Sequence, residues 1–234
     1  LGPLILVGWL GLAGVGNMPW LMIPGLLAAG VLFMRLRQAP HRAPGAGEQF
    51  PLRQALRRLR PMLIPMGAIL LLRAMMESAL AGFVPTLITQ SGEALWLAGV
   101  SFAVMEAAGV VGALSGGSLS DRLGRRRVML GSMALAPLAL LLYLSAQGWL
   151  ALVVLAGVGL LAMAVNPVVM AVFQESLPEN RALANGIYMA VHLVLRAFAT
   201  LAIGALGDAG GLRYAFTICA WAALAAAPLV LLLP

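Results

Sequence analysis

The segment from Ala94 to Ala146 reads ALWLAGVSFAVMEAAGVVGALSGGSLSDRLGRRRVMLGSMALAPLALLLYLSA, two long apolar stretches joined by a short loop rich in glycine and arginine. The apolar stretches cover residues 94–116 and 128–146. Each has about the 20 residues that an α-helix needs to cross the hydrocarbon core of a bilayer. The segment therefore predicts two membrane-spanning helices connected by a tight polar loop.

The rest of the chain has the same character. Of its 234 residues 62% are hydrophobic and only 10% are charged, whereas soluble domains are about a quarter charged. Further apolar stretches occupy 1–15, 20–34, 61–87, 149–172, 183–205 and 214–233. We expect an all-α fold, a polytopic membrane helix bundle of about eight transmembrane helices.

The distribution of charge predicts the orientation of the bundle. The net charge is +7 and all 15 basic residues are arginine. The segments 35–60, 122–127 and 173–182 together hold twelve arginines, while the loops on the other side hold Arg213 alone. Cytoplasmic loops collect Arg and Lys, so we expect these segments to be cytoplasmic and the chain to lie in a bacterial plasma membrane. No basic stripe with interleaved aromatics indicates nucleic-acid binding.

The segment 35–60 separates two groups of helices. Residues 40–49 have the composition of a flexible linker, and between Pro51 and Arg60 apolar side chains recur on one helical face with arginine on the other. A basic amphipathic turn of this kind lies on a membrane surface; a solvated linker with chance periodicity is the alternative. We expect three parts: helices in 1–34, a basic cytoplasmic linker in 35–60, and six helices in 61–234.

The loop between residues 94–116 and 128–146 carries a specific pattern, Gly117-x3-Asp121-Arg122-x-Gly124-Arg125-Arg126. This resembles the signature loop of the major facilitator superfamily, which joins adjacent helices on the cytoplasmic side. An ordinary positive-inside loop explains the arginines but not the spaced glycines and aspartate. Glycine permits a tight reversal, and Asp121 can pair with a nearby arginine, so these six residues are candidates for a gating motif.

The resemblance implies a layout for the whole chain. Superfamily members have twelve helices in two six-helix halves joined by a long cytoplasmic loop. Here 61–234 is the complete second half and 1–34 the last two helices of the first, so the chain is expected to be N-terminally truncated, with the missing N-terminal helices of the same protein as its partner. The spacing of Gly117, Asp121 and Gly124 recurs in Gly204, Asp208 and Gly211, as inverted three-helix repeats predict.

Charged residues inside the apolar stretches mark a candidate site. They are Arg73, Glu77, Glu106, His192 and Arg196. Such groups are costly at the bilayer centre and usually mark a substrate or ion path. We expect the arginines to attract an anionic or polar solute and Glu77 or Glu106 to carry a proton, because desolvation favours the neutral carboxyl. The alternative is that Arg73–Glu77 and Glu106–Arg196 are structural ion pairs.

The function that follows is secondary active transport, with membrane lipids, a small-molecule solute and protons as partners. The general look is similar to the drug-efflux branch of the superfamily, including fosmidomycin-resistance-type exporters, which implies a proton antiporter for multidrug efflux. We expect no cofactor, no metal and no enzyme activity, since catalytic motifs are missing from the sequence. A non-transporting receptor or scaffold with the transporter fold is the alternative, and an intramembrane enzyme a more remote one.

Overall fold

The computed structural model describes residue 9 and residues 15–37 and 52–232, without the side chains of residues 15, 18, 36 and 52–64. Every regular element in the described part of the chain is helical, which confirms the all-α prediction. The chain divides into two compact units, Leu1–Phe50 and Pro51–Pro234.

The first unit contains a short 3₁₀-helix, η1 (Val15–Leu21), that leads into the α-helix α2 (Met22–Arg37). Pro19 lies inside η1, where the sequence predicts a turn. Helix α2 has 16 residues, a length of about 24 Å, against about 30 Å for a bilayer core. The first predicted span, 1–15, falls almost wholly outside the described residues, as does the linker segment 40–49.

The second unit is a bundle of six α-helices. They are α3 (Leu52–Gln90), α4 (Leu95–Leu123), α5 (Arg125–Ser145), α6 (Gly148–Ser176), α7 (Arg181–Gly210) and α8 (Leu212–Leu229). A 3₁₀ turn, η2 (Pro178–Asn180), precedes α7, and another, η3 (Val230–Leu232), follows α8. All six helices are long and apolar enough to cross a membrane. The last six predicted spans thus each correspond to one helix.

Most helices run past the apolar stretch that predicted them. Helix α3 begins at Leu52 rather than near residue 61, so the basic segment after Pro51 continues directly into a membrane helix. Helix α4 ends at Leu123 rather than at 116. The reason is that hydropathy marks the length in contact with lipid, whereas helical hydrogen bonding continues into the flanking polar residues.

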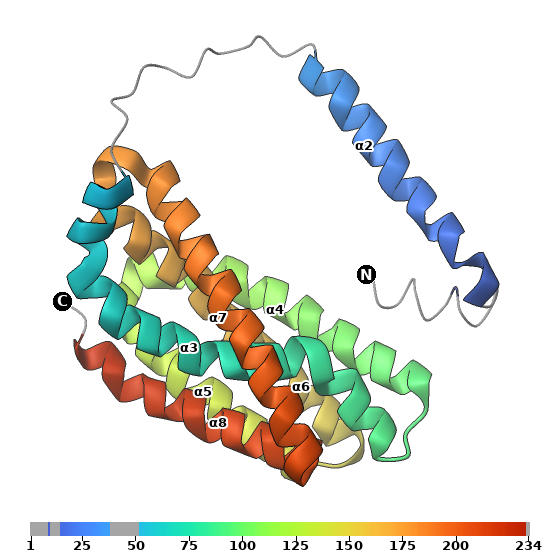
Figure 1. The fold of residues 1–234 in the computed structure, drawn as a ribbon. Helices are drawn as coiled ribbons and strands as arrows, with labels where there is room; N and C mark the ends of the chain where they lie inside the picture. The colour runs from blue at the N-terminus through green and yellow to red at the C-terminus, as the bar shows by residue number, and fades with distance from the viewer. Residues whose placement is uncertain (1–8, 10–14, 38–51, 233–234) are drawn as a thin grey trace. The chain divides into compact units, whose positions relative to one another are not determined.

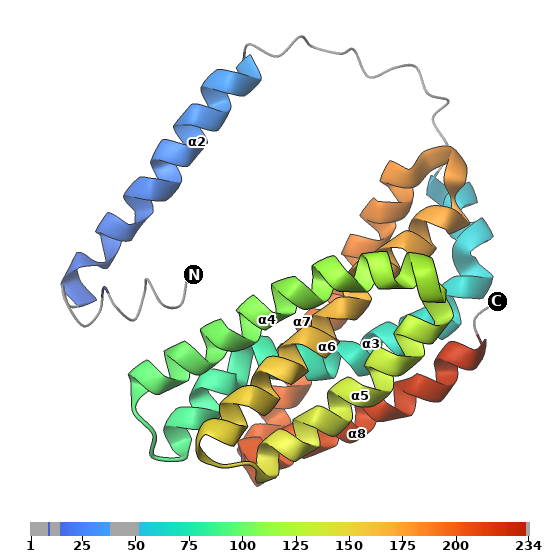
Figure 2. The same ribbon diagram turned by 180° about the vertical axis from the view of Figure 1, so that it is seen from behind.

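The helices form a bundle with two distinct ends (Figure 1). The α4–α5 loop and the α6–α7 connection lie at one end, which we call the loop end. The α3–α4, α5–α6 and α7–α8 turns lie together at the other, which we call the turn end, and the view from behind shows the same arrangement (Figure 2). Helix α4 packs chiefly against α6, and α3 packs against α7 and α8.

Apolar side chains fill the interior in two clusters. One lies toward the turn end and includes Leu80, Leu155 and Phe216; the other lies toward the loop end and includes Met66 and Phe173. Large apolar side chains also cover the outside, and Leu193 and Leu201 of α7 are 69% and 71% exposed. An apolar surface of this extent does not suit water; it fits a lipid environment.

The orientation can be tested by cysteine labelling, after Cys219 has been replaced by alanine. Labelling needs an exposed position at each end of the bundle. Ser120 at the loop end is unsuitable because it is buried, and Gly210 at the turn end is unsuitable because a side chain there would meet the Tyr214 ring. We therefore choose the exposed Arg127 at the loop end and the exposed Ala209 at the turn end. A membrane-impermeant maleimide should label Arg127→Cys only from the cytoplasmic side and Ala209→Cys only from outside. Labelling of both from one side would overturn the predicted topology.

Candidate functional site

Arg73 is the centre of a polar network between the two apolar clusters. Its residue is 3% exposed, and it forms an ion pair with Glu77, one turn further along α3. The same guanidinium donates hydrogen bonds to Asn166 Oδ1 at 2.7 Å and to the Ala162 carbonyl oxygen at 3.2 Å, both on α6. The predicted Arg73–Glu77 pair is present within α3, and the two hydrogen bonds of Arg73 tie α3 to α6.

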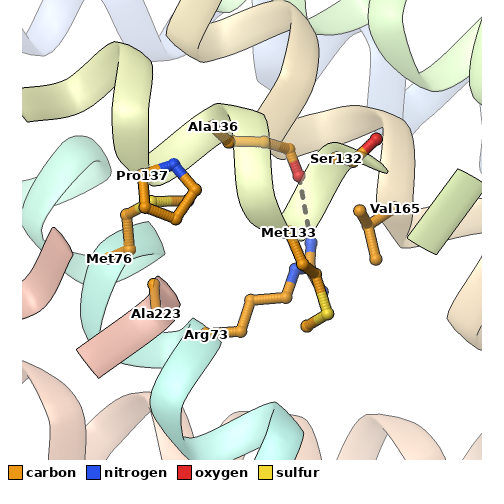
Figure 3. A pocket seen from close by; sticks show the side chains of 9 residues that line it. Arg73, Met76, Ser132, Met133, Ala136, Pro137, Val165 and Ala223 are labelled. Atoms are coloured by element: carbon orange, nitrogen blue, oxygen red, sulfur yellow. Dashed lines mark hydrogen bonds between the residues drawn. The ribbon is translucent and has the colours of Figure 1, made fainter. Parts of the chain in front are cut away.

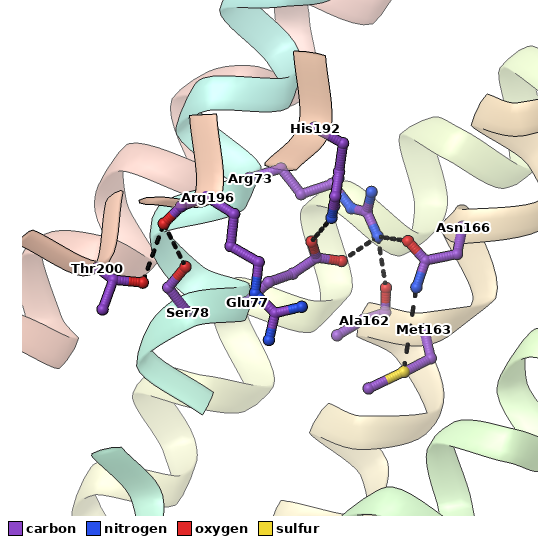
Figure 4. A network of polar contacts seen from close by, with 9 residues as sticks. All are labelled: Arg73, Glu77, Ser78, Ala162, Met163, Asn166, His192, Arg196 and Thr200. Atoms are coloured by element: carbon purple, nitrogen blue, oxygen red, sulfur yellow. Dashed lines mark hydrogen bonds and ion pairs between the residues drawn. The ribbon is translucent and has the colours of Figure 1, made fainter. Parts of the chain in front are cut away.

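Glu77 also faces α7. Its Oε2 atom lies 3.9 Å from His192 Nε2 (Figure 4), so a protonated His192 would form a second ion pair with it. The ring of His192 packs against the buried ring of Tyr188, with the centroids 5.7 Å apart. Glu77 therefore lies between a guanidinium on its own helix and an imidazole on another.

A cavity of about 150 Å³ opens beside this network. Four of the five predicted binding residues line it: Glu77, Glu106, His192 and Arg196. They come from α3, α4 and α7, and α6 contributes further residues that include Asn166 and Met163. Charged residues that are far apart in the sequence thus share one cavity midway along the bundle.

Two expectations for the charged residues are not met. One is that Arg73 lines the same cavity as the others, and the other is that Glu106 pairs with Arg196. Arg73 does not line this cavity, since its contacts are with Glu77 and α6. Among the described residues, no ion pair joins Glu106 to Arg196, although both line the cavity. The backbone carbonyl oxygen of Arg196 accepts hydrogen bonds from the Ser78 hydroxyl at 3.3 Å and from the Thr200 hydroxyl at 2.9 Å.

A second, much smaller cavity lies on the other side of Arg73 (Figure 3). Its volume of about 10 Å³ is that of a single water molecule. Ser132 and Met133 of α5 line it together with Arg73, and Nη1 of Arg73 is buried with no hydrogen-bond partner among the residues that the structure describes. Because a buried guanidinium nitrogen favours a partner, this cavity suits one water molecule.

The signature loop is a tight turn between α4 and α5. Gly124 has φ +90°, a conformation that glycine adopts readily and other residues rarely. Its N–H donates to the Ser120 carbonyl oxygen at 3.0 Å and closes the last turn of α4. Gly117 lies two turns earlier, facing Pro167 of α6. Gly124 thus makes the tight reversal, while Gly117 lies inside α4 in an ordinary contact.

The charged residues of the loop do not pair as expected. Asp121 and Arg122 are exposed, and no ion pair in the described part of the chain involves Asp121. The suggested pairing of Asp121 with a nearby arginine is therefore missing from this conformation. Arg125 instead pairs with Glu175 at the end of α6, and Arg126 donates to the Leu231 carbonyl oxygen at 2.6 Å.

The second copy of the spacing forms a matching turn at the opposite end. Gly211 has φ +85°, and its N–H donates to the Gly207 carbonyl oxygen at 2.8 Å, four residues back, as Gly124 does to Ser120. Both turns join a long helix directly to the next helix. This correspondence favours the inverted-repeat interpretation over chance spacing.

Small residues bring α4 and α6 close together. A Cβ atom at Gly112 would lie 2.7 Å from the carbonyl carbon of Leu160, and one at Gly116 would lie 2.8 Å from that of Ala164. Gly159 makes a reciprocal approach to Met105. The glycines of α4 therefore serve helix packing, and this packing positions Glu106 beside the cavity.

The structural role of the Arg73–Glu77 pair can be measured. Removing one partner of a buried pair costs about 3–5 kcal/mol, whereas replacing both with apolar residues is often neutral. We expect Arg73→Met to lower the thermal unfolding temperature in detergent clearly, and Arg73→Met combined with Glu77→Leu to recover most of the loss. A double variant as unstable as Arg73→Met would show that the loss does not come from the uncompensated charge of Glu77.

Comparison with known proteins agrees with this architecture. The family model of the Major Facilitator Superfamily matches residues 98–234, more than half of the chain. The chain is also similar to the uncharacterized MFS-type transporter YfnC of Bacillus subtilis (strain 168), with 38% identity over 105 residues. These residues make up 44% of this chain and 25% of that relative, so the chain matches about a quarter of the relative's length.

A bundle of apolar helices around a charged central cavity is the architecture of a multi-pass membrane protein. The extent of the family match establishes the particular group: this chain belongs to the Major Facilitator Superfamily.

Several site residues were not selected from the sequence. The hydrogen bond of Asn166 to Arg73 and the contact of Tyr188 with His192 depend on how α3, α6 and α7 are arranged. The only signal for Asn166 was a polar residue before Pro167 in an otherwise apolar helix, and for Glu175 an acidic residue near the arginine-rich loop end.

Proposed function

We propose that this chain belongs to a proton-coupled antiporter that exports a small organic solute across a bacterial plasma membrane. The observation that carries the proposal is the shared cavity, in which two carboxyl groups, a histidine and an arginine from three helices meet midway along an apolar bundle. Carboxyl groups at such a depth are expensive and usually serve proton or substrate translocation.

The residues of the cavity have different roles in this proposal. Arg196 is exposed on α7 and free of ion pairs in the described structure, so it is the cation that attracts a polar or anionic part of the solute. Arg73 is a positioning residue, because its donors are directed to Glu77 and α6. His192 faces Glu77, and in its protonated form it would compensate the negative charge of that carboxylate.

Glu106 is the carboxyl group that carries the coupled proton. Glu77 has a guanidinium as a permanent neighbour on its own helix and forms an ion pair with it. Glu106 lies in the same cavity, half-buried and without an ion-pair partner among the described residues. It can lose its proton when Arg196 approaches and regain it when the solute occupies that arginine.

The loop residues Gly117, Asp121, Arg122, Gly124, Arg125 and Arg126 control the conformational exchange. The pair Arg125–Glu175 and the bond from Arg126 to Leu231 join the start of α5 to the end of α6 and to η3. These contacts hold the loop end together in the present conformation, while Asp121 remains available for a contact formed in another.

A variant of Asp121 separates gating from binding. Because this residue is exposed at the loop end, away from the cavity, Asp121→Ala in the full-length transporter should lower the transport rate about tenfold, a change of about 1.4 kcal/mol in barrier. The dissociation constant of the solute should stay within about twofold, a difference of about 0.4 kcal/mol. Loss of binding with normal conformational exchange would contradict this role; Asp121→Asn tests the charge alone.

The proposed activity is tested in everted membrane vesicles that contain the full-length transporter. Respiration acidifies their interior, and a panel of small organic solutes is then added while a pH-sensitive dye reports the gradient. An antiporter dissipates the gradient when its solute enters. A receptor or scaffold with the same fold, the alternative, would bind a solute and leave the gradient unchanged.

A further inference from the structure

A third cavity, larger than the two described above, lies at the turn end, apart from the central site. Its volume is about 690 Å³, within the range of small-molecule sites. The ends of α3 and α5, the starts of α4, α6 and α8, and two connecting turns line it. None of the residues that line the central cavity lines this one.

The cavity contains one group of each charge. Glu93 lies on the α3–α4 turn and Arg213 in the first turn of α8. No ion pair joins them in the described part of the chain. Arg213 is fixed to the cavity wall by a hydrogen bond to the Leu144 carbonyl oxygen. A guanidinium has five N–H donors, so its others remain for a ligand.

The neutral lining adds polar and aromatic contacts. Ser101 is 4% exposed and lines the cavity. A serine hydroxyl can both donate and accept a hydrogen bond, so it offers a polar contact to a ligand in the cavity. Trp149 also lines the cavity, and an indole face attracts organic cations.

We propose that this cavity is a second binding site, for a ligand that carries an ammonium group and an oxyanion. Glu93 and Trp149 bind the cation, and Arg213 binds the anion, with Ser101 as a deeper polar contact. A separated acid and base favour a zwitterion over a ligand of one charge, because either single charge would leave one group uncompensated. A free zwitterionic solute and a phosphatidylcholine-type lipid headgroup share this chemistry. The proposal is independent of the direction of transport and of proton coupling.

Fluorine NMR tests this site on the 234-residue chain itself. The five tryptophans are replaced by 5-fluorotryptophan, and Trp149→Phe identifies the resonance of Trp149. Phenylalanine, phenylalaninamide and N-acetylphenylalanine then serve as zwitterionic, cationic and anionic probes with one common body. We expect phenylalanine to shift the Trp149 resonance saturably, and each singly charged probe to bind about tenfold more weakly.

Variants assign the two charges. Glu93→Gln should remove the preference for phenylalanine over N-acetylphenylalanine, which lacks the ammonium group. Arg213→Gln should remove the preference for phenylalanine over phenylalaninamide, which lacks the carboxylate. Arg127→Gln, which removes an exposed arginine at the other end, is the matched control and should bind phenylalanine like the unaltered chain. Glu93 lies on an exposed turn, so its variant remains informative if Arg213→Gln fails to fold.

Lipid nanodiscs distinguish the two sources of the ligand. If a phospholipid headgroup occupies the site, phosphatidylcholine nanodiscs will shift the Trp149 resonance and block phenylalanine, while phosphatidylglycerol nanodiscs will not. If phenylalanine shifts the Trp149 resonance equally in both kinds of nanodisc, the ligand is a soluble zwitterion. Equal binding of the three probes, unchanged selectivity in both variants, or no shift with any probe or lipid would overturn the proposal.

Discussion

Glu106→Gln should abolish proton-driven uphill transport in the full-length transporter and leave downhill solute exchange intact. Glu106 lines the central cavity without an ion-pair partner among the described residues, so its charge can follow the state of the cavity. Glutamine keeps the size and the hydrogen bonding of the protonated acid but cannot release a proton. Accumulation against a gradient, followed in proteoliposomes with an imposed pH difference, should fall to the level of empty liposomes.

Two further variants make this result specific. Glu77→Gln should retain coupling with reduced stability, because Glu77 is held by Arg73. Asp208→Asn changes an exposed acid near the end of α7, outside the cavity, and should behave like the unaltered protein. If Glu77→Gln loses coupling and Glu106→Gln keeps it, the two roles are exchanged. If both keep it, the proton is carried by a residue other than Glu77 and Glu106.

The second large effect is expected from Gly112→Leu, which should prevent stable folding of the bundle. A Cβ at this position would lie 2.7 Å from the carbonyl carbon of Leu160, so the backbones of α4 and α6 must separate. Overpacking a core costs about 1–3 kcal/mol or more, and a clash against backbone cannot be relieved by a rotamer change. Thermal unfolding in detergent and the yield of monodisperse protein measure the effect.

A glycine in open surroundings provides the control for this prediction. A Cβ atom at Gly157 of α6 would meet no atom of a neighbouring helix within 4 Å, so Gly157→Ala should be neutral or slightly stabilising through helix propensity. Gly112→Ala should already be clearly destabilising. Equal stability of the two alanine variants would contradict the close approach of α4 and α6.

The helices of the second unit could be predicted from the sequence because lipid imposes a simple requirement. A span must be apolar for about 20 residues, and the stretches 94–116 and 149–172 lie within α4 (Leu95–Leu123) and α6 (Gly148–Ser176) apart from a single residue at 94. The start of α3 was misplaced because hydropathy carries no information about a helix that continues beyond the membrane. The two helices predicted in 1–34 are described only from Val15 onward, as η1 and α2.

Local pairs in the site could be predicted, and distant ones could not. Arg73 and Glu77 are four residues apart on one helix, which brings their side chains together whatever the fold. A pair between Glu106 and Arg196 also needs α4 and α7 at matching heights and rotations, which sequence spacing does not specify. For the same reason, the bond from Arg73 to Asn166 across 93 residues became evident only from the packing of α3 on α6.

The central claim is that the charged cavity couples solute movement to proton movement. Its most direct test is the internal pH of proteoliposomes that contain the purified full-length transporter and a solute identified in the vesicle screen. When a solute gradient is imposed without a pH gradient, we predict a proton flux opposite to the solute flux, and none with Glu106→Gln. Saturable solute binding with no solute-driven change in internal pH in the unaltered protein would contradict the claim.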